Sequence, residues 1–337
     1  MMNIKKRVII FFFYLLLISC DDNKSSECYP ETNGRGKIIS VLPLGDISSS
    51  FLSDFLIDNN IDIGVIPEND VEVYSIVYQT IDWNNVIRHA SGAIYIPKID
   101  GRQKFPIYSG QHGTESKRSN VASLIPLRGF DSMFMASVGY IGSSPDLLGL
   151  GVSDDVVHPY VHKFVAEAVI DKIRAVKNFA CERGIGYNEQ LFVAGYSEGG
   201  YVTMATHKLI EEKYSDEFKL TASAPMAGPY DLSGTMVDKM LDDNLYGEPF
   251  YLPYLIYSYI TYYDIMGSVE DYFLPGFVEV IHEQYGGDYG ASFLNNYMNE
   301  NNYNPPKLCM KTDVINEFES NQNHVLRQVL SNNDLFD

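Results

Sequence analysis

The chain has 337 residues, and its balance of 45% hydrophobic and 20% charged residues is typical of a globular protein rather than a disordered one. The formal net charge of −19 at pH 7 repels phosphate backbones, so nucleic acid is not an expected partner. The length allows one large α/β domain or two ordinary domains.

The first residues have the pattern of an export signal. Basic residues 5–7 precede an apolar run, 8–18, that is too short to span a bilayer. The run ends in Leu-Ile-Ser-Cys, which resembles a lipobox in which Cys20 would carry lipid; an ordinary secretory signal with a chance cysteine is the alternative. We expect residues 1–20 to be a lipoprotein signal peptide and 21–36 a flexible tether. The protein would then be attached to the outer membrane or cell surface.

Strand and helix patterns alternate in the next part of the chain. Residues 71–80 alternate between apolar and polar side chains, which predicts a half-buried strand, and 161–179 show helical spacing of apolar positions. Further strands are predicted at 91–97, 105–109, 138–144, 190–194 and 220–224, and further helices at 47–56, 123–136 and 198–212. This alternation indicates an α/β fold, a mainly parallel sheet with helices on its faces, although the first two strands are expected to be antiparallel.

The composition changes after residue 232. Residues 233–337 are rich in Tyr, Phe and Asn, are broken by Pro253 and Pro275, and show no alternating strands. We therefore expect an α/β core at 37–232 and a helical cap, or lid, at 233–337.

The strongest chemical signal is Gly-Tyr-Ser-Glu-Gly-Gly at 195–200. A serine hydroxyl is a weak nucleophile that must be exposed beside a base, and Gly-x-Ser-x-Gly places it at the apex of a sharp turn from a strand into a helix. An apolar strand precedes Ser197 and a helical pattern follows it, as the motif requires. Ser197 is therefore the predicted nucleophile, and a structural turn with a solvated serine is the alternative.

The segment Gln-His-Gly-Thr at 111–114 follows the third predicted strand. In hydrolases with this turn, the amide after the nucleophile and an amide from such a loop stabilise the oxyanion. The expected donors are the backbone N–H groups of Glu198 and of Gly113 or Thr114. A plain glycine turn is the alternative, and His112 is expected to shape the loop rather than act as base.

Five segments occur in an order that resembles one known family. They are Gln-His-Gly-Thr, Pro-Asp-Leu-Leu-Gly-Leu-Gly at 145–151, His-Pro-Tyr at 158–160, Gly-Tyr-Ser-Glu-Gly-Gly and Ala-Gly-Pro-Tyr-Asp-Leu-Ser at 227–233, and together they resemble the secretory lipase-like family of α/β hydrolases. The resemblance runs from about residue 71 to the end. It implies an α/β-hydrolase sheet, ester hydrolysis with Ser197 as nucleophile, and a lid over the pocket. Asp146 is expected to be structural.

The catalytic acid and base are harder to find. In this fold they follow the serine, each after a later strand, and the similar family continues past a segment like 321–327 into two such strands. This sequence ends at 337, so the last strands, the acid and the histidine are expected to be missing. Impaired activity and a strand at 220–224 left on the sheet edge would follow.

The rival hypothesis takes the base from the histidines that remain. His207 is expected on a helix face, which leaves His282 and His324 as weak candidates. The residues before His282 fit either a strand or a helix that begins at Pro275 and stops at Gly286.

A carboxylic-ester hydrolase that forms an acyl-Ser197 intermediate on an apolar ester is the leading prediction. A peptidase of the same fold and a non-catalytic surface lipoprotein that binds a ligand are the alternatives. No cofactor is expected, because the sequence shows neither a phosphate loop nor a dinucleotide fingerprint, and no metal is expected, because Cys28, Cys181 and Cys309 lack metal-ligand spacing. They allow one disulfide with one free thiol, or no disulfide at all.

Overall fold

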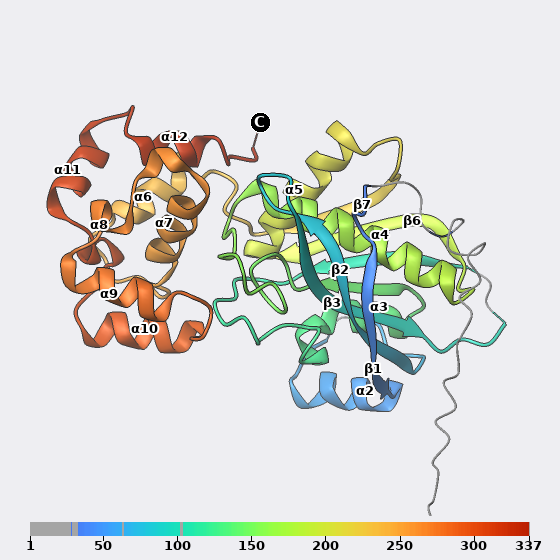
Figure 1. The fold of residues 1–337 in the computed structure, drawn as a ribbon. Coiled ribbons are helices and arrows are strands. Elements are labelled where there is room, and N and C mark those ends of the chain that lie inside the picture. The colour runs from blue at the N-terminus through green and yellow to red at the C-terminus, as the bar shows by residue number, and fades with distance from the viewer. Residues whose placement is uncertain (1–27, 29–32, 63, 102–103, 337) are drawn as a thin grey trace, which may run out of the picture.

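The computed structural model describes residue 28 and residues 33–62, 64–101 and 104–336. Within these residues, a central sheet is covered by helices on both faces. The C-terminal helices form a second body beside it (Figure 1). The predicted signal peptide and Cys20 lie outside the described residues. No helix of the described part is long and apolar enough to cross a membrane.

The sheet has seven strands in the order β1-β2-β3-β5-β4-β6-β7. Their bounds are β1 Ile38–Ile47, β2 Val71–Ile81, β3 Ile87–Pro97, β4 Phe105–Gln111, β5 Ile141–Pro145, β6 Tyr187–Tyr196 and β7 Leu220–Met226. The pairs from β1 to β3 and the pair β3–β5 are antiparallel, whereas β5, β4, β6 and β7 are parallel. The predicted α/β class is confirmed, and β7 lies at an edge of the sheet.

The edge strand β1 was not predicted. It contains Pro43 and Gly45 and lacks alternation of apolar and polar residues, and its register shifts between these two positions. An edge strand tolerates a proline because its outward N–H needs no partner in the sheet, and glycine often marks such a bulge. Pairing with β2, rather than the local sequence, therefore makes this segment a strand.

Two apolar clusters cover the two faces of the sheet. Helices α4 (Ala166–Glu182) and α5 (Glu198–Lys213) bury their apolar side chains against one face. Helices α2 (Ser49–Asp58) and α3 (Phe130–Ser137) cover the other face. The helix predicted at 123–136 begins later than expected, because a 3₁₀ turn at Pro126–Gly129 precedes α3.

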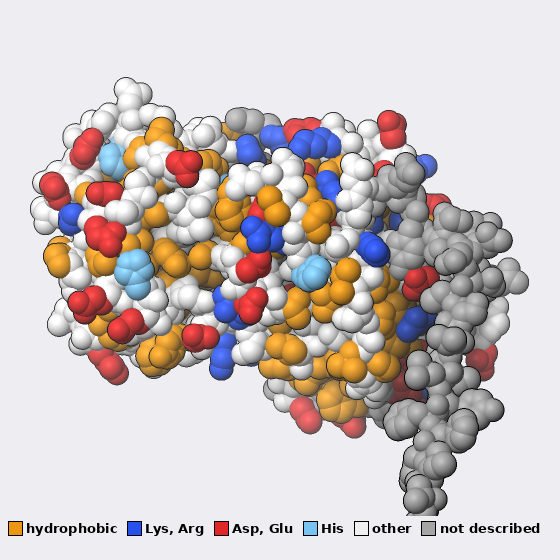
Figure 2. Space-filling model, in the orientation of Figure 1, with side chains coloured by type: hydrophobic (Ala, Val, Ile, Leu, Met, Phe, Trp, Pro, Cys, Tyr) orange, Lys and Arg blue, Asp and Glu red, His pale blue; other side chains and the backbone are white. Residues whose placement is uncertain are grey.

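The C-terminal helices pack around an apolar core, rich in Tyr and Phe, to which Tyr160, Tyr201 and Ala205 of the α/β domain also contribute. They are α6 Thr235–Leu241, α7 Tyr251–Tyr262, α8 Val269–Tyr272, α9 Pro275–Gln284, α10 Ala291–Glu300, α11 Thr312–Ser320 and α12 Val325–Ser331. Helix α9 begins at Pro275 and contains His282, so the helix alternative for this segment is the correct one. On the face seen in Figure 2, acidic side chains are scattered over this helical body.

The end of the described chain returns to the α/β core. The Asp334 carboxylate accepts hydrogen bonds from the backbone N–H groups of Leu232 and Ser233, and the Leu335 N–H donates to the Tyr230 carbonyl. The buried Tyr201 hydroxyl donates to the Asn333 carbonyl. The segment after α12 is therefore fixed beside α5.

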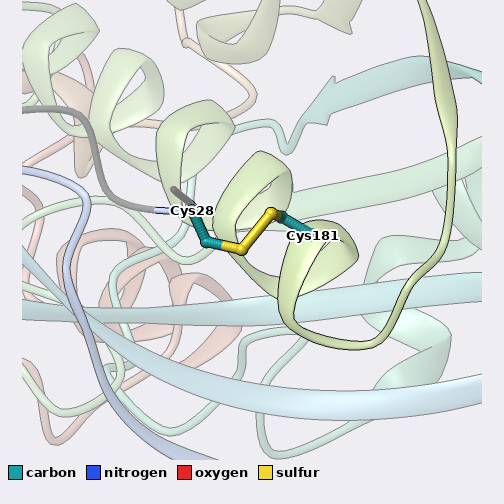
Figure 3. Close-up of a disulfide and its surroundings, with 2 residues drawn as sticks. All are labelled: Cys28 and Cys181. Atoms are coloured by element: carbon teal, nitrogen blue, oxygen red, sulfur yellow. A yellow bond between two sulfur atoms is a disulfide. The ribbon is translucent and has the colours of Figure 1, made fainter. Parts of the chain in front are cut away.

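A disulfide joins Cys28 to Cys181 near the end of α4, and Cys309 is a buried free thiol (Figure 3). The structure thus decides between the cysteine alternatives. Nearby, Arg35 donates to the carboxylates of Asp171 and Glu167 on α4. The disulfide and these ion pairs hold the described part of the segment before β1 against that helix.

Lys172 lies on the inner face of α4 and is fully buried. Its Nζ donates to the Ala93 carbonyl on β3 at 2.8 Å. Burial disfavours the charged amine and lowers the pKa of Lys172 to about 7. A neutral amine still donates this hydrogen bond, so the group fits the core once its proton is lost.

This burial makes stability depend on pH. An unfolded lysine keeps its proton up to about pH 10.4, so between pH 7 and 10 the unfolded chain binds more protons than the folded chain. The contribution of Lys172 to stability therefore rises with pH across that window. We expect Lys172→Met to gain stability relative to the unchanged protein at pH 7, and to lose that advantage by pH 10, in urea unfolding at each pH. A stability difference that does not vary with pH would contradict this account.

Candidate active site

Ser197 lies at the junction of β6 and α5 in a rare backbone conformation. Its φ of 59° and ψ of −123° fall in a region that side-chain-bearing residues seldom adopt. Its N–H donates to the Met226 carbonyl at 2.9 Å, and its carbonyl accepts from the Tyr201 N–H at 3.1 Å. These bonds hold the strained residue at the apex of the turn, with its side chain partly exposed. The strand, turn and helix expected around the motif are all present.

The glycines around Ser197 are required by close backbone contacts. A Cβ atom on Gly195 would lie 2.3 Å from the Gly199 carbonyl oxygen, and one on Gly199 would lie 2.1 Å from the Gln111 carbonyl oxygen. A Cβ on Gly200 would lie 2.3 Å from the Met226 carbonyl oxygen. The turn is therefore pressed against the ends of both β4 and β7, its neighbours in the sheet.

The loop after β4 lies beside Ser197. A Cβ built on Gly113 would come within 3.4 Å of the Tyr196 carbonyl oxygen and 3.9 Å of the Ser197 Cβ. The N–H of Glu198 belongs to the first turn of α5, where N–H groups have no acceptor within the helix. The predicted oxyanion donors Glu198, Gly113 and Thr114 thus belong to two segments that meet at the serine.

His112 and Asp146 shape this loop. The two ring nitrogens of His112 lie 2.7 Å from the Gly113 carbonyl and 3.1 Å from the Asp146 carbonyl. The buried Asp146 carboxylate accepts from the Ser91 hydroxyl and the Ser123 N–H. Both residues therefore make the structural contacts expected of them.

A buried pair of charged side chains adjoins the turn and was missed by the sequence analysis. Glu198 Oε1 lies 2.8 Å from His158 Nε2, and both side chains are almost fully buried. His158 Nδ1 lies 2.8 Å from the Leu148 carbonyl. Burial by itself lowers the pKa of His158, but the charge of Glu198 and the two hydrogen bonds outweigh it, so the pKa is raised. A buried glutamate needs such a partner, but the burial of Glu198 is a property of the folded protein that the sequence does not show.

The two weak base candidates lie on helices of the C-terminal body. His282 is exposed on α9, 3.7 Å from Glu270. His324 caps α12, where its Nδ1 accepts from the Leu326 N–H, and burial lowers its pKa. Neither forms a hydrogen bond with Ser197, whose hydroxyl has no such partner among the residues that the structure describes.

A serine does contact a histidine at the edge of the sheet. Ser223 Oγ on β7 lies 2.7 Å from His207 Nδ1, and His207 Nε2 lies 3.2 Å from Glu211 on α5. Ser223 sits within a strand and has no positive φ or adjoining glycine loop, so it lacks the turn that exposes Ser197. It provides a matched comparison for Ser197.

A small apolar cavity of about 50 Å³ lies between the core and the C-terminal helices. It is lined mainly by Tyr, Leu, Met and Pro side chains, among them Tyr160, Tyr251, Leu232, Met236, Leu255 and Pro306. The Tyr160 hydroxyl lies 3.4 Å from the Thr114 hydroxyl, which connects the cavity wall to the loop beside Ser197. In the described part of the chain, no group of three or more His, Cys, Asp or Glu residues is arranged to hold a metal ion.

Two solved structures superimpose on most of this chain. One is a ligand-bound form of the rice cell wall degrading esterase LipA from Xanthomonas oryzae, 27% identical, with a TM-score of 0.79 over 89% of this chain and 79% of that one. The other is a putative hydrolase from Legionella pneumophila, 27% identical, with a TM-score of 0.76 over 88% of this chain and 79% of that one. No family model matches the sequence, and no curated protein matches it either.

The contact at Gly199 can be tested directly. We expect Gly199→Ala to push the turn away from the Gln111 carbonyl, at a cost on the order of 1–3 kcal/mol in unfolding free energy. A fluorophosphonate, which reacts with activated serines, should then label Ser197 at least tenfold more slowly. Gly276→Ala is the matched control, because a Cβ there meets nothing within 4 Å. Equal effects of the two substitutions on labelling would count against this role for the contact.

Proposed function

We propose that this chain, a carboxylic-ester hydrolase of the lipase-like α/β-hydrolase type by its similarity to the two solved structures, cleaves apolar esters through an acyl intermediate on Ser197. The observation that carries this proposal is the strained turn at Ser197 with the Gly113 loop beside it. A binding module would not need a serine held at such a turn.

In the proposed reaction, Ser197 Oγ attacks the ester carbonyl carbon and gives up its proton to a base. The negative oxygen of the tetrahedral intermediate accepts hydrogen bonds from the N–H of Glu198 and from that of Gly113 or Thr114, each worth about 3 kcal/mol. The alcohol leaves with a proton, and water then releases the acid from the acyl-serine. Among these steps, oxyanion stabilisation is supported most directly, because both donor segments adjoin the serine.

The described residues supply the nucleophile and the oxyanion donors but no imidazole in contact with the Ser197 hydroxyl. Loss of one triad member typically leaves about 10³- to 10⁴-fold acceleration over water. The chain should therefore hydrolyse esters slowly. The second candidate, a surface protein that binds an ester-like ligand without turning it over, is the alternative that the experiment below tests.

The cavity beside Tyr160 supports an apolar acyl group as its occupant, because its walls are aliphatic and aromatic. Its volume is small, about 50 Å³. Esters of small acids are thus the first substrates to test.

Export forms part of the proposal. The disulfide between Cys28 and Cys181 fits an oxidising compartment outside the cytoplasm. Attachment through lipid on Cys20 would place the catalytic body outside the membrane.

Substitution of single serines distinguishes Ser197, which lies at the strained turn, from Ser223, which contacts a histidine. We expect the unchanged protein to hydrolyse p-nitrophenyl acetate weakly but measurably, and to be labelled by a fluorophosphonate. Ser197→Ala should abolish both, because the hydroxyl held at the strained turn is lost, whereas Ser223→Ala should retain both. Mass spectrometry of the labelled peptide identifies the modified serine.

Activity that survives Ser197→Ala would exclude Ser197 as nucleophile. If the protein turns over esters at ordinary enzyme rates and Ser197→Ala abolishes this activity, Ser197 is the nucleophile and the prediction of slow hydrolysis is wrong. Binding of a butyrate ester without labelling or hydrolysis would favour the second candidate. Cleavage of a peptide amide in preference to the ester would indicate a peptidase instead.

Lipid attachment is tested by growing expressing cells with radiolabelled palmitate. We expect label in the full-length protein and none in Cys20→Ser, because the thiol carries the lipid. A variant that lacks label but is still cleaved and secreted would match this expectation, whereas unchanged labelling of Cys20→Ser would rule out the site.

A further inference from the structure

The pair formed by His158 and Glu198 joins two segments that are far apart in the sequence. Glu198 directly follows Ser197 and begins α5, while His158 lies in the loop between β5 and α4. The Glu198 side chain is 1% exposed and that of His158 is 2% exposed. The residue whose N–H is the proposed oxyanion donor is therefore anchored through its own side chain.

The hydrogen bonds define how many protons the pair holds. The Leu148 carbonyl can only accept, so His158 Nδ1 carries a hydrogen. The 2.8 Å contact between His158 Nε2 and Glu198 Oε1 then requires a second proton between them. With that proton the buried pair is neutral overall. Without it, a buried carboxylate faces a nitrogen lone pair, which is strongly unfavourable.

Glu198 has little other support for its charge. Its second oxygen, Oε2, is buried and has no hydrogen-bond partner among the described residues. The groups around the pair are the Tyr201 phenol on α5, the Tyr160 phenol, the Tyr251 and Tyr254 phenols on α7, and the Glu115 carboxylate, and the Arg118 guanidinium acts on Tyr254. Phenols are neutral at ordinary pH and Glu115 is acidic. Of the two cationic side chains, the His158 imidazolium is the one that contacts Glu198.

The same pair supports the C-terminal helices. The ring of Tyr254 on α7 lies 6.3 Å from that of His158 and 4.7 Å from that of Tyr160, measured between centroids. The Tyr254 hydroxyl donates to the Glu115 carbonyl at 3.2 Å. Movement of His158 would therefore disturb both the Ser197 turn and the packing of α7 through Tyr254.

We propose that His158, as an imidazolium, is a positioning residue that fixes Glu198 and the Ser197 turn and seats α7 over them. The proposal rests on the role of Ser197 proposed above, but the ion pair itself can be measured without it. When the pair loses its shared proton, the turn and α7 loosen together.

The direction of the pH dependence follows from the raised pKa of His158. The stabilisation is fully present below the ordinary imidazole pKa of about 6.5 and is lost as the pH rises through the raised value. Reactivity of Ser197 should therefore acquire a falling limb at high pH. A triad base would give the opposite limb, because a base works when it is deprotonated.

The test compares His158→Gln, Glu198→Gln and the double variant. Titration of the His158 imidazole by NMR should give a pKa above 6.5, which falls in Glu198→Gln because the carboxylate charge is gone. His158→Gln leaves that charge buried without a cation and should slow fluorophosphonate labelling at least tenfold. The double variant removes the charge as well and should label within about threefold of Glu198→Gln. His162→Gln is the matched control, since burial lowers the pKa of His162 to about 3 and its ring contacts no carboxylate among the described residues. The falling limb should persist in this variant.

The proposal would be overturned if the double variant lost labelling rate by the product of the two single effects, or if the His158 imidazole titrated at or below pH 6.5. If the unchanged protein is not labelled at all, the role of Ser197 fails. The urea midpoints of the same variants then test the ion pair. A double variant that is more stable than His158→Gln supports the pair, and a double variant whose loss of stability is the sum of the two single losses rejects it. If His158→Gln does not fold, two results still test the proposal. A lower His158 pKa in Glu198→Gln together with a double variant that folds supports it, and an unchanged pKa or an unfolded double variant contradicts it.

Discussion

The turn at Ser197 exists because backbones touch there without side chains between them. Gly199 lies against the carbonyl at the end of β4, and Gly200 lies against the carbonyl at the end of β7. These contacts require β6 to lie between β4 and β7, which the order of the sheet provides. Since the loop with Gly113 begins where β4 ends, the contact that strains the serine also brings the oxyanion loop to it. The geometry of the site therefore follows from three adjacent strands.

The C-terminal helices rest on the same edge of the sheet. Their aromatic core includes Tyr160 from the loop after β5 and Tyr201 from α5, so it is continuous with the residues behind the turn. The Tyr201 hydroxyl also holds the end of the described chain through the Asn333 carbonyl. A ligand at Ser197 would consequently contact both the α/β core and the C-terminal helices, and a displacement of α7 would change the position of the residues behind Ser197.

Buried charge is treated in two ways in this acidic protein. Glu198 and Asp171 each meet a cationic partner, His158 in one case and Arg35 with Arg174 in the other. Paired charges of this kind contribute little net stability but fix the elements that carry them, because removal of one partner leaves the other unpaired. Lys172 instead donates to the Ala93 carbonyl, and burial outweighs the nearby charge of Asp146, so that its proton is lost more easily. The paired sites thus hold geometry, whereas the unpaired lysine makes stability depend on pH.

Local sequence determined the elements whose signals lie within a few residues: the alternating strand β2, the amphipathic helix α4 and the sharp turn at Ser197. Each depends on periodicity or on glycine spacing, which a linear pattern records. Contacts between distant segments decided the rest. Pairing with β2 makes β1 a strand despite Pro43, and the fold selects Cys181 as the partner of Cys28. Forty residues separate His158 from Glu198, and only packing of the loop after β5 against α5 brings them together, because burial of a charge is settled by three-dimensional surroundings rather than by neighbours along the chain.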